Sequence, residues 1–115
     1  MLLRLDTSDT RPLHEQVAAA LRRAIAEGEC RAGDRLPSAR DLSAALDINV
    51  NTVLRGLREL RDEGLLEFRR GRGITVAEGA SRRSGLQIRV RELVAEASRL
   101  GYSRADVIDM IRGLT

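Results

Sequence analysis

Residues 36–64 read LPSARDLSAALDINVNTVLRGLRELRDEG and carry the signals of two helices joined by a short turn. Ser38 is followed three residues later by Asp41, a pairing that typically begins a helix. The hydroxyl accepts a hydrogen bond from a free backbone N–H, and the carboxylate lies near the positive end of the helix dipole. Asn49 can begin a second helix in the same way, and Gly64 is placed to end it. The stretch therefore predicts a short helix, a tight turn and a longer helix.

The longer helix has two unlike faces. Apolar side chains recur at helical spacing on one face: Val50, Val53, Leu57 and Leu60. The opposite face is polar, with Thr52 on its flank: Asn51, Arg55, Arg58 and Asp62. Asn and Arg side chains can form paired hydrogen bonds with adenine and guanine edges, and the first turn of a recognition helix is the part that reaches them. A surface helix without any ligand also has a polar face, so this helix alone leaves both interpretations open.

The flanking sequence carries a resemblance to a known family. Upstream lies PLHEQVAAALRRAIAEGECRAGDRLPSARDLSAAL, and downstream lies EGLLEFRRGRGITV. In order and spacing, residues 12–76 resemble the DNA-binding domain of the GntR family of bacterial transcription regulators. NVNTVLRGLREL stands in place of the arginine-led start that is commoner in the family's recognition helix, and with the short tail after Ala80 it is similar to the YtrA-type subfamily. The resemblance implies a winged helix-turn-helix fold and a DNA-binding regulator, and such relatives often control neighbouring transporter operons.

The shorter helix is flanked by two arginines, Arg35 and Arg40. In the resembled family an arginine at the place of Arg40 contacts DNA, and the helix N-terminus that Ser38 begins offers backbone N–H groups to a phosphate. An ion pair between Arg40 and a nearby surface acid is the alternative. Before this helix, residues 31–36 form a turn around Gly33 that leads to a proline.

The turn between the two helices departs from the family pattern at Asp47, where glycine is usual. Such turns commonly need a positive φ, and Asp is among the few other residues that tolerate it. Leu54 is a second departure, because many family members have arginine there, whereas Arg55 follows the YtrA-like pattern. The operator sequence is therefore left open.

A β-hairpin with a basic tip is predicted after Gly64. Its two strands are apolar in composition: Leu65, Leu66 and Phe68, then Ile74, Thr75 and Val76. The tip is basic and contains glycine: Arg69, Arg70, Gly71, Arg72 and Gly73. Glycine lets the backbone approach a groove wall, and arginine suits phosphates or a narrow minor groove. The resemblance makes this hairpin the wing, although three exposed arginines could also be simply solvated.

The chain before residue 36 predicts one more helix. Pro12 suits its first position and Gly28 its end, with an apolar face between them: Leu13, Val17, Leu21, Ala24 and Ile25. Leu2, Leu3 and Leu5 form either a short strand or an apolar strap in front of it.

Size and charge bound the function. The 115 residues suffice for one small domain and an appendage, and so small a core gains from a partner chain. All 20 basic residues are arginine and the net charge is +3. Residues 1–80 hold 13 arginines and 13 acids, which cancel. The case for nucleic acid therefore depends on where the arginines lie rather than on how many there are.

Other classes of function have little support. Cys30 is the single cysteine and His14 the single histidine, so neither an internal disulfide nor a metal cluster of the usual spacing is expected. Neither residue has a recognisable catalytic partner nearby, so we expect no enzyme activity and no cofactor. There is no apolar run that could span a bilayer and no secretion signal at the start, which favours the cytoplasm.

The tail predicts two amphipathic helices after a polar linker at 79–84. Apolar residues recur at spacings of four and three residues, which is typical of a helix–helix seam. We predict that this seam and the following helix form a dimer contact through Leu86, Val90, Leu93, Ala97, Leu100, Val107 and Ile111. A tail of this size is too small to enclose a metabolite pocket of about 300 Å³. Packing of the tail on its own domain is the alternative.

Together these features predict a mainly α fold with a small β-hairpin wing. Residues 1–78 form the winged helix-turn-helix domain and residues 85–115 the two-helix dimerisation region. The expected function is sequence-specific regulation of transcription, as a repressor. The protein is expected to act as a homodimer on a two-fold operator in double-stranded DNA. A winged-helix module that binds a protein is the alternative. The predicted DNA contacts are Arg35, Ser38, Arg40, Asn49, Asn51, Thr52, Arg55, Arg58, Arg69, Arg70, Gly71 and Arg72. An effector and the regulated genes cannot be read from these residues.

Overall fold

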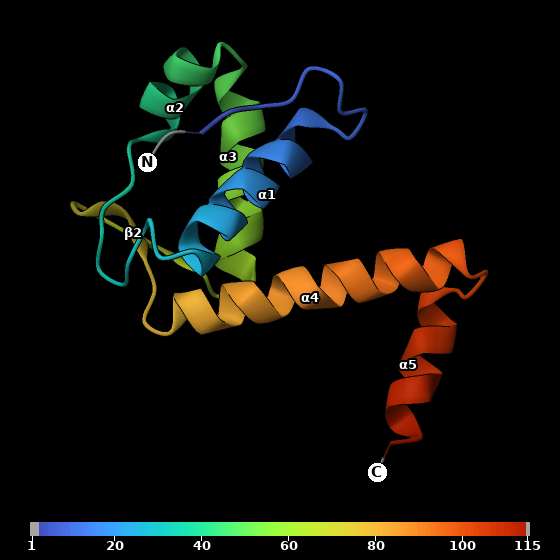
Figure 1. The fold of residues 1–115 in the computed structure, drawn as a ribbon. Helices are drawn as coiled ribbons and strands as arrows, with labels where there is room; N and C mark the ends of the chain where they lie inside the picture. Colours follow the sequence, from blue (N-terminus) through green and yellow to red (C-terminus); the bar gives the residue numbers. More distant parts are fainter. Residues whose placement is uncertain (1–2, 115) are drawn as a thin grey trace. The chain divides into compact units, whose positions relative to one another are not determined.

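The computed structural model describes residues 3–114, which contain five helices and one antiparallel hairpin (Figure 1). The elements in chain order are α1 (Leu13–Ala26), α2 (Ala39–Leu46), α3 (Val50–Asp62), β1 (Leu66–Arg69), β2 (Gly73–Val76), α4 (Ala80–Arg99) and α5 (Arg104–Arg112). The chain divides into two compact units, Met1–Gly85 and Leu86–Thr115. The predicted mainly α fold with a small hairpin wing is confirmed.

The core of the first unit lies where α1 and α3 pack against each other. A Cβ atom at Gly56 of α3 would lie 2.9 Å from the carbonyl oxygen of His14 and 3.1 Å from Cγ1 of Val17, so only glycine permits this approach. The fully buried apolar side chains come from both helices and the start of the hairpin: Val17, Leu21, Ile25, Val53, Leu57, Leu60 and Leu65. The predicted apolar faces of α1 and α3 were each wrong at their first residue. Leu13 of α1 is 45% exposed and Val50 of α3 is 38% exposed. Both residues belong to the first turn of their helices, where the packed region ends.

The predicted helix boundaries around the turn are confirmed. Ser38 Oγ accepts a hydrogen bond from the backbone N of Asp41 at 3.0 Å, and Asn49 Oδ1 accepts one from the backbone N of Asn51 at 2.7 Å. Asp47 adopts the left-handed conformation that the turn requires, with φ 55° and ψ 49°. These local features fix where α3 begins and therefore which of its residues occupy the first turn.

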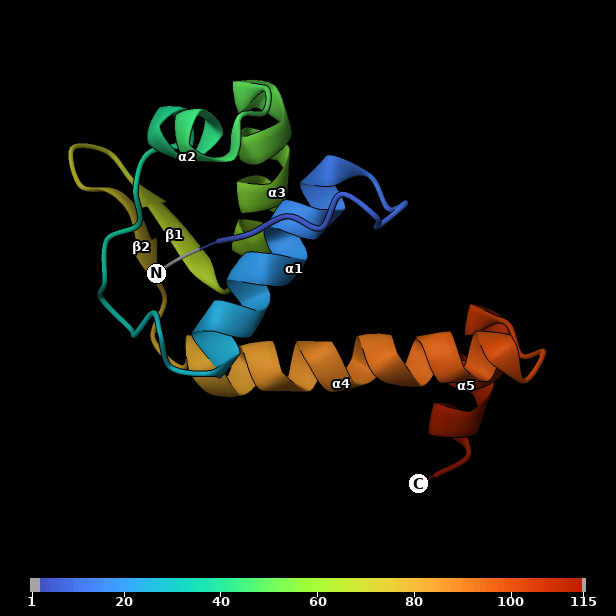
Figure 2. The ribbon, with the colours of Figure 1, turned by 45° about the horizontal axis from the view of Figure 1, so that its top comes forward.

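The hairpin pairs β1 with β2 in antiparallel register, with Leu66 opposite Val76 and Arg69 opposite Gly73. A segment before α2 extends this small sheet: the backbone N of Leu36 donates to the carbonyl of Ile74 at 2.8 Å, and Arg35 forms a bridge with Thr75. Figure 2 shows the loop between β1 and β2 extending away from the helices. The wing is thus held at its base by three stretches of chain.

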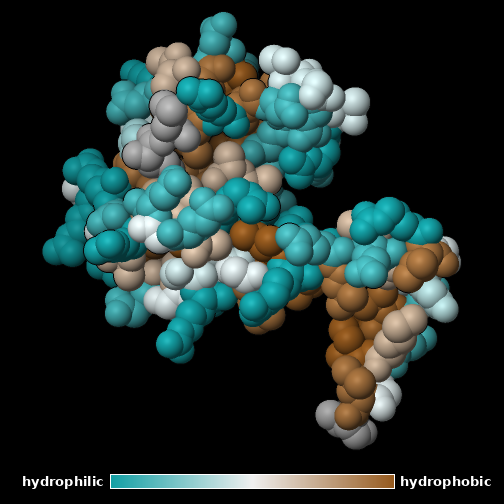
Figure 3. All heavy atoms as spheres, in the orientation of Figure 1, coloured by the Kyte–Doolittle hydropathy of each residue, from teal (hydrophilic) through white to brown (hydrophobic). Residues whose placement is uncertain are grey.

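The second unit contains most of α4 and all of α5. Ser103 and Asp106 form a full capping box at the start of α5, with hydrogen bonds of 2.8 and 3.1 Å. The hydrogen bonds from Ser103 hold the pKa of the Asp106 carboxyl below its usual range. Figure 3 shows hydrophobic side chains gathered along α5. None of the helices in residues 3–114 combines the length and the apolar composition needed to cross a membrane.

The predicted linker at 79–84 was wrong. α4 begins at Ala80, and the side chains of Ala80 and Ser84 are buried within the first unit, at 1% and 0% exposure. A run of small and polar residues is typical of a linker, but small side chains also allow a helix to pack closely. Here tertiary packing overrides the composition signal.

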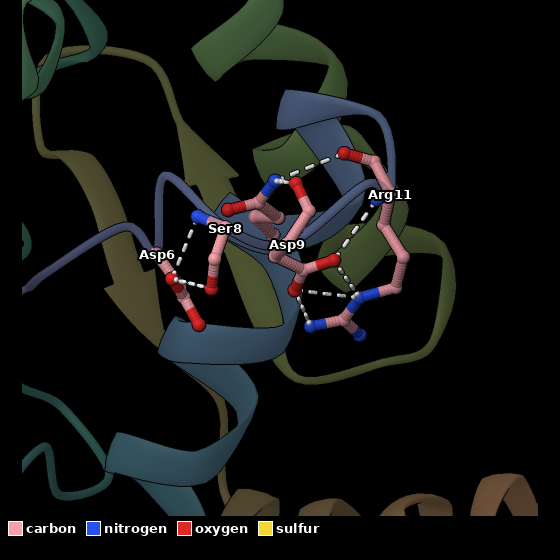
Figure 4. Close-up of polar contacts among 5 residues, drawn as sticks. Asp6, Ser8, Asp9 and Arg11 are labelled. Atoms are coloured by element: carbon pink, nitrogen blue, oxygen red, sulfur yellow. Dashed lines mark hydrogen bonds and ion pairs between the residues drawn. The ribbon is translucent and has the colours of Figure 1, made fainter.

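The segment before α1 is a folded loop rather than a strand (Figure 4). Leu3 and Leu5 pack partly buried against the core, as an apolar strap would, whereas Leu2 lies outside the described residues. Within the loop, the Arg11 guanidinium forms an ion pair with Asp9 at 2.7 Å and holds the pKa of that carboxyl below its usual range. The buried Gln16 of α1 donates to the carbonyl of Arg11 at 2.9 Å, which fixes the loop to the helix.

Candidate nucleic-acid interface

The polar face of α3 lies opposite the residues that pack into the core and is open to solvent. Val53, Leu57 and Leu60 are completely buried, which turns the opposite side of the helix outward. The predicted base-contacting residues on that side are exposed: Asn51, Arg55 and Arg58. Thr52 is half-buried on the flank. The first turn of the helix, begun by the Asn49 cap, therefore presents an amide at Asn51 to solvent and, one turn later, a guanidinium at Arg55.

The N-terminal end of α2 presents a second polar group. Arg40 is exposed, and its guanidinium makes no ion pair within residues 3–114, so the alternative of a surface ion pair finds no support. Ser38 is exposed next to it and uses its oxygen as the helix cap. A cation beside the positive end of a helix is well placed to hold a phosphate group.

The arginines of the wing differ in whether they have an acidic partner. Arg69 forms an ion pair with Glu67 at 2.5 Å on the same strand, so much of its charge is already balanced. Arg70 and Arg72 are exposed, and in the part of the chain that the structure describes neither has an acidic partner. Gly71 lies between them with φ +79°, a conformation that favours glycine, and nothing lies within 4 Å of the position its Cβ would take. The tip is therefore open, cationic and narrow.

Arg35 belongs to the base of the wing, a placement that sequence reasoning missed. A Cβ atom at Gly73 would lie 3.2 Å from Nε of Arg35, so the arginine side chain passes directly over this glycine. The signal was present in the sequence as a second glycine two residues after Gly71. Gly73 therefore supports the site by making room for Arg35, and Arg35 is connected to the wing as well as to α2.

One arginine of the first unit is structural. Arg22 lies in the apolar stripe of α1, and its guanidinium binds both carboxylate oxygens of Glu63 at 2.9 and 2.7 Å with only 4% of its side chain exposed. The helical spacing from Ala18 and to Ile25 could have identified it as buried. Arg22 is therefore not available to bind DNA.

His14 and Cys30 are the residues considered for other chemistry. His14 is half-buried, and burial raises the pKa of the Cys30 thiol, which disfavours the thiolate. Within residues 3–114 there is no cluster of three or more His, Cys, Asp or Glu side chains that could hold a metal ion.

Comparison with known proteins gives a consistent result. The family model described as "Bacterial regulatory proteins, gntR family" matches residues 13–76. The HTH-type transcriptional repressor YtrA of Bacillus subtilis is 34% identical over 79 residues, which span 69% of this chain and 61% of the repressor. The solved structure of YtrA from Sulfolobus acidocaldarius, a GntR-family transcription factor, is 31% identical with a TM-score of 0.64, over 81% of this chain and 98% of that one. The DNA-binding domain of AraR, solved with operator ORE1, shares the fold at 22% identity and a TM-score of 0.57, over 67% of this chain and 94% of that one.

Proposed function

Because the chain belongs to the GntR family of bacterial regulatory proteins, we propose that it represses transcription as a homodimer that sets two α3 helices into successive major grooves of a two-fold operator. DNA-binding transcription regulation is the function of this family. The observation that carries the proposal is the outward face of α3, where Asn51 and Arg55 are exposed. The wing adds two exposed arginines, Arg70 and Arg72, that have no acidic partner within residues 3–114. The expected compartment is the cytoplasm, where such DNA is found.

The contacts divide by chemistry into two groups. Side chains of the α3 face that can form paired hydrogen bonds with bases are proposed to select the sequence: Asn51, Arg55 and Arg58. Caps and cations around them are proposed to hold phosphates: Arg35, Ser38, Arg40, Asn49, Thr52, Arg69, Arg70, Gly71 and Arg72. Among these, Arg69 is expected to contribute least because it already has an acidic neighbour.

The dimer contact is proposed on the second unit. Five of the seven predicted residues are exposed in the single chain, each with about half or more of its surface open: Leu86, Val90, Leu93, Leu100 and Ile111. Ala97 and Val107 are already buried within the chain, each 8% exposed, so they support α4 and α5 rather than the partner. Burial of the exposed apolar surface against a second copy would favour the dimer through the hydrophobic effect. The tail therefore supplies the dimerisation surface, and residues 1–85 supply the DNA-binding unit.

The experiment that tests this proposal begins with selection of binding sites from random duplex DNA, followed by binding titrations at several salt concentrations. The expected result is a two-fold symmetric site whose binding constant falls steeply with salt. If no sequence is enriched and binding to duplex DNA is weak and insensitive to salt, the proposal is wrong, and the surface would then be assigned to a protein partner. Light scattering with and without the operator checks the two-to-one stoichiometry.

A further inference from the structure

The start of α4 is bound to the DNA-binding unit by side-chain hydrogen bonds. Ser84 Oγ donates to the carbonyl oxygen of Arg22 in α1. One residue earlier, Nη1 of Arg83 donates to the carbonyl oxygen of Gly64, just after α3, at 2.6 Å. Gly64 has φ +81°, and a Cβ atom there would lie 3.0 Å from the same Nη1 atom, so this glycine both ends α3 and makes room for Arg83. We call Arg83 and Ser84 the α4 clamp.

The α4 clamp lies next to buried residues of the first unit. Ser84 is fully buried and Ala80, one turn earlier, is 1% exposed. The ends of α1 and α3 beneath them are joined by the buried pair of Arg22 and Glu63, with two hydrogen bonds of 2.9 and 2.7 Å. A bidentate arginine–carboxylate pair fixes both distance and direction. The clamp therefore holds the start of α4, which belongs to the first unit, against α1 and the residue that follows α3.

This arrangement has a consequence for DNA binding. α4 is helical without interruption from Ala80 to Arg99, and the proposed dimer residues begin at Leu86, two residues after the clamp. A flexible linker at this position would let two DNA-binding units reach half-sites over a range of separations, whereas a helix that starts from a fixed place reaches few of them. Resting on the proposed homodimer, we propose that Arg83 and Ser84 are specificity-determining residues that restrict the spacing of the operator half-sites.

The test uses duplexes that carry two copies of the selected half-site, with the spacing between them changed one base pair at a time. In competition binding, the wild-type chain should prefer one spacing over a spacing 5 base pairs longer by about 10-fold or more, since this addition turns the second half-site by about half a helical turn. Replacing both clamp residues, Arg83→Ala with Ser84→Ala, should reduce this preference to about threefold, while affinity for a single half-site changes by no more than about twofold. Arg82→Ala is the matched control, because the exposed side chain of Arg82 makes no hydrogen bond or ion pair within residues 3–114. Its loss should leave the spacing preference unchanged.

The outcomes separate this inference from the proposed function. If the clamp variants stay dimeric in light scattering and keep the wild-type spacing preference, the clamp has no such role, although the homodimer proposal stands. Should the double variant lose single half-site binding through misfolding, Arg83→Ala alone decides, because this exposed side chain can be removed without opening the core. Unchanged spacing preference in that variant would overturn the inference. A wild-type chain that is monomeric and binds paired and single half-sites equally would overturn the homodimer and this inference with it.

Discussion

We expect the wing arginines Arg70 and Arg72 to control how steeply DNA binding depends on salt. Both are exposed at the hairpin tip and have no acidic partner within residues 3–114, so each can neutralise one phosphate and release its counterion. Replacing both with alanine should weaken binding to most duplexes to the same degree. The preference among base pairs should remain, because phosphate contacts carry no direct sequence information.

The size of the effect follows from the number of contacts. Each lost phosphate contact lowers the log–log salt slope by about 0.9, so two arginines in each protomer of the proposed dimer lower it by about 3.6. When salt rises from about 50 to 200 mM, both proteins lose affinity for DNA. The factor by which the variant's binding constant falls should be about 150 times smaller than the factor for the wild type. Arg69→Ala should change the slope less, because Glu67 lies 2.5 Å from the Arg69 guanidinium.

The assay is fluorescence anisotropy with a labelled operator duplex at five or more salt concentrations, repeated with a scrambled duplex. Glu67→Gln serves as the reciprocal test: it frees Arg69 and should steepen the slope by up to about 0.9 per protomer. The reasoning is refuted if the double alanine variant keeps the wild-type slope, or if Arg69→Ala lowers the slope as much as Arg70→Ala does.

Four further outcomes follow from the same structure. Asn51→Ala or Arg55→Ala should relax preference at particular base pairs by about 1 to 3 kcal/mol, measured by binding to single-substituted operators, while an unchanged base preference would remove these side chains from base recognition. Leu93→Asp should yield monomers at micromolar concentration, since Leu93 is half exposed in the single chain and the dimer would bury a charge; an intact dimer in light scattering would contradict this. Asp47→Gly should be neutral or mildly stabilising and Asp47→Val should cost about 1 to 2 kcal/mol, compared by urea midpoints at fixed protein concentration. The folded-state pKa of Asp106 is depressed, so its cap stabilises α5 above the unfolded pKa of about 3.9 and loses that effect as pH falls through the folded value. Circular dichroism should show a smaller loss of helicity on acidification in Asp106→Asn than in the wild type.

Much of the first unit could be predicted because its signals are local. A cap bonds to a backbone N–H two or three residues away, as Ser38 and Asn49 do, and a left-handed turn is decided by the few residues that tolerate it, as at Asp47. The apolar stripe of α3 likewise follows from helical periodicity. With the resemblance to a known family, these features were sufficient for the winged helix-turn-helix fold and for the exposed face of α3.

The predictions failed where contacts join residues that are distant in sequence. The stretch at 79–84 has a linker composition, yet it is helical because its small residues fit against the ends of α1 and α3. Periodicity also identifies an apolar face without saying what covers it, and two residues of the predicted seam, Ala97 and Val107, are already buried within the single chain.

The sequence by itself determined the starts of α2 and α3, the left-handed turn between them and the polar face of α3, because each depends on interactions within a few residues. Only the tertiary structure decided which arginines are available for DNA. Arg22 binds the Glu63 carboxylate, which the fold brings beside it, whereas Arg70 and Arg72 have no such partner within residues 3–114. For Arg22 that partner lies 41 positions away in the chain. The charge of an arginine is fixed by its chemistry, but its freedom to meet a phosphate depends on which acid the fold brings beside it.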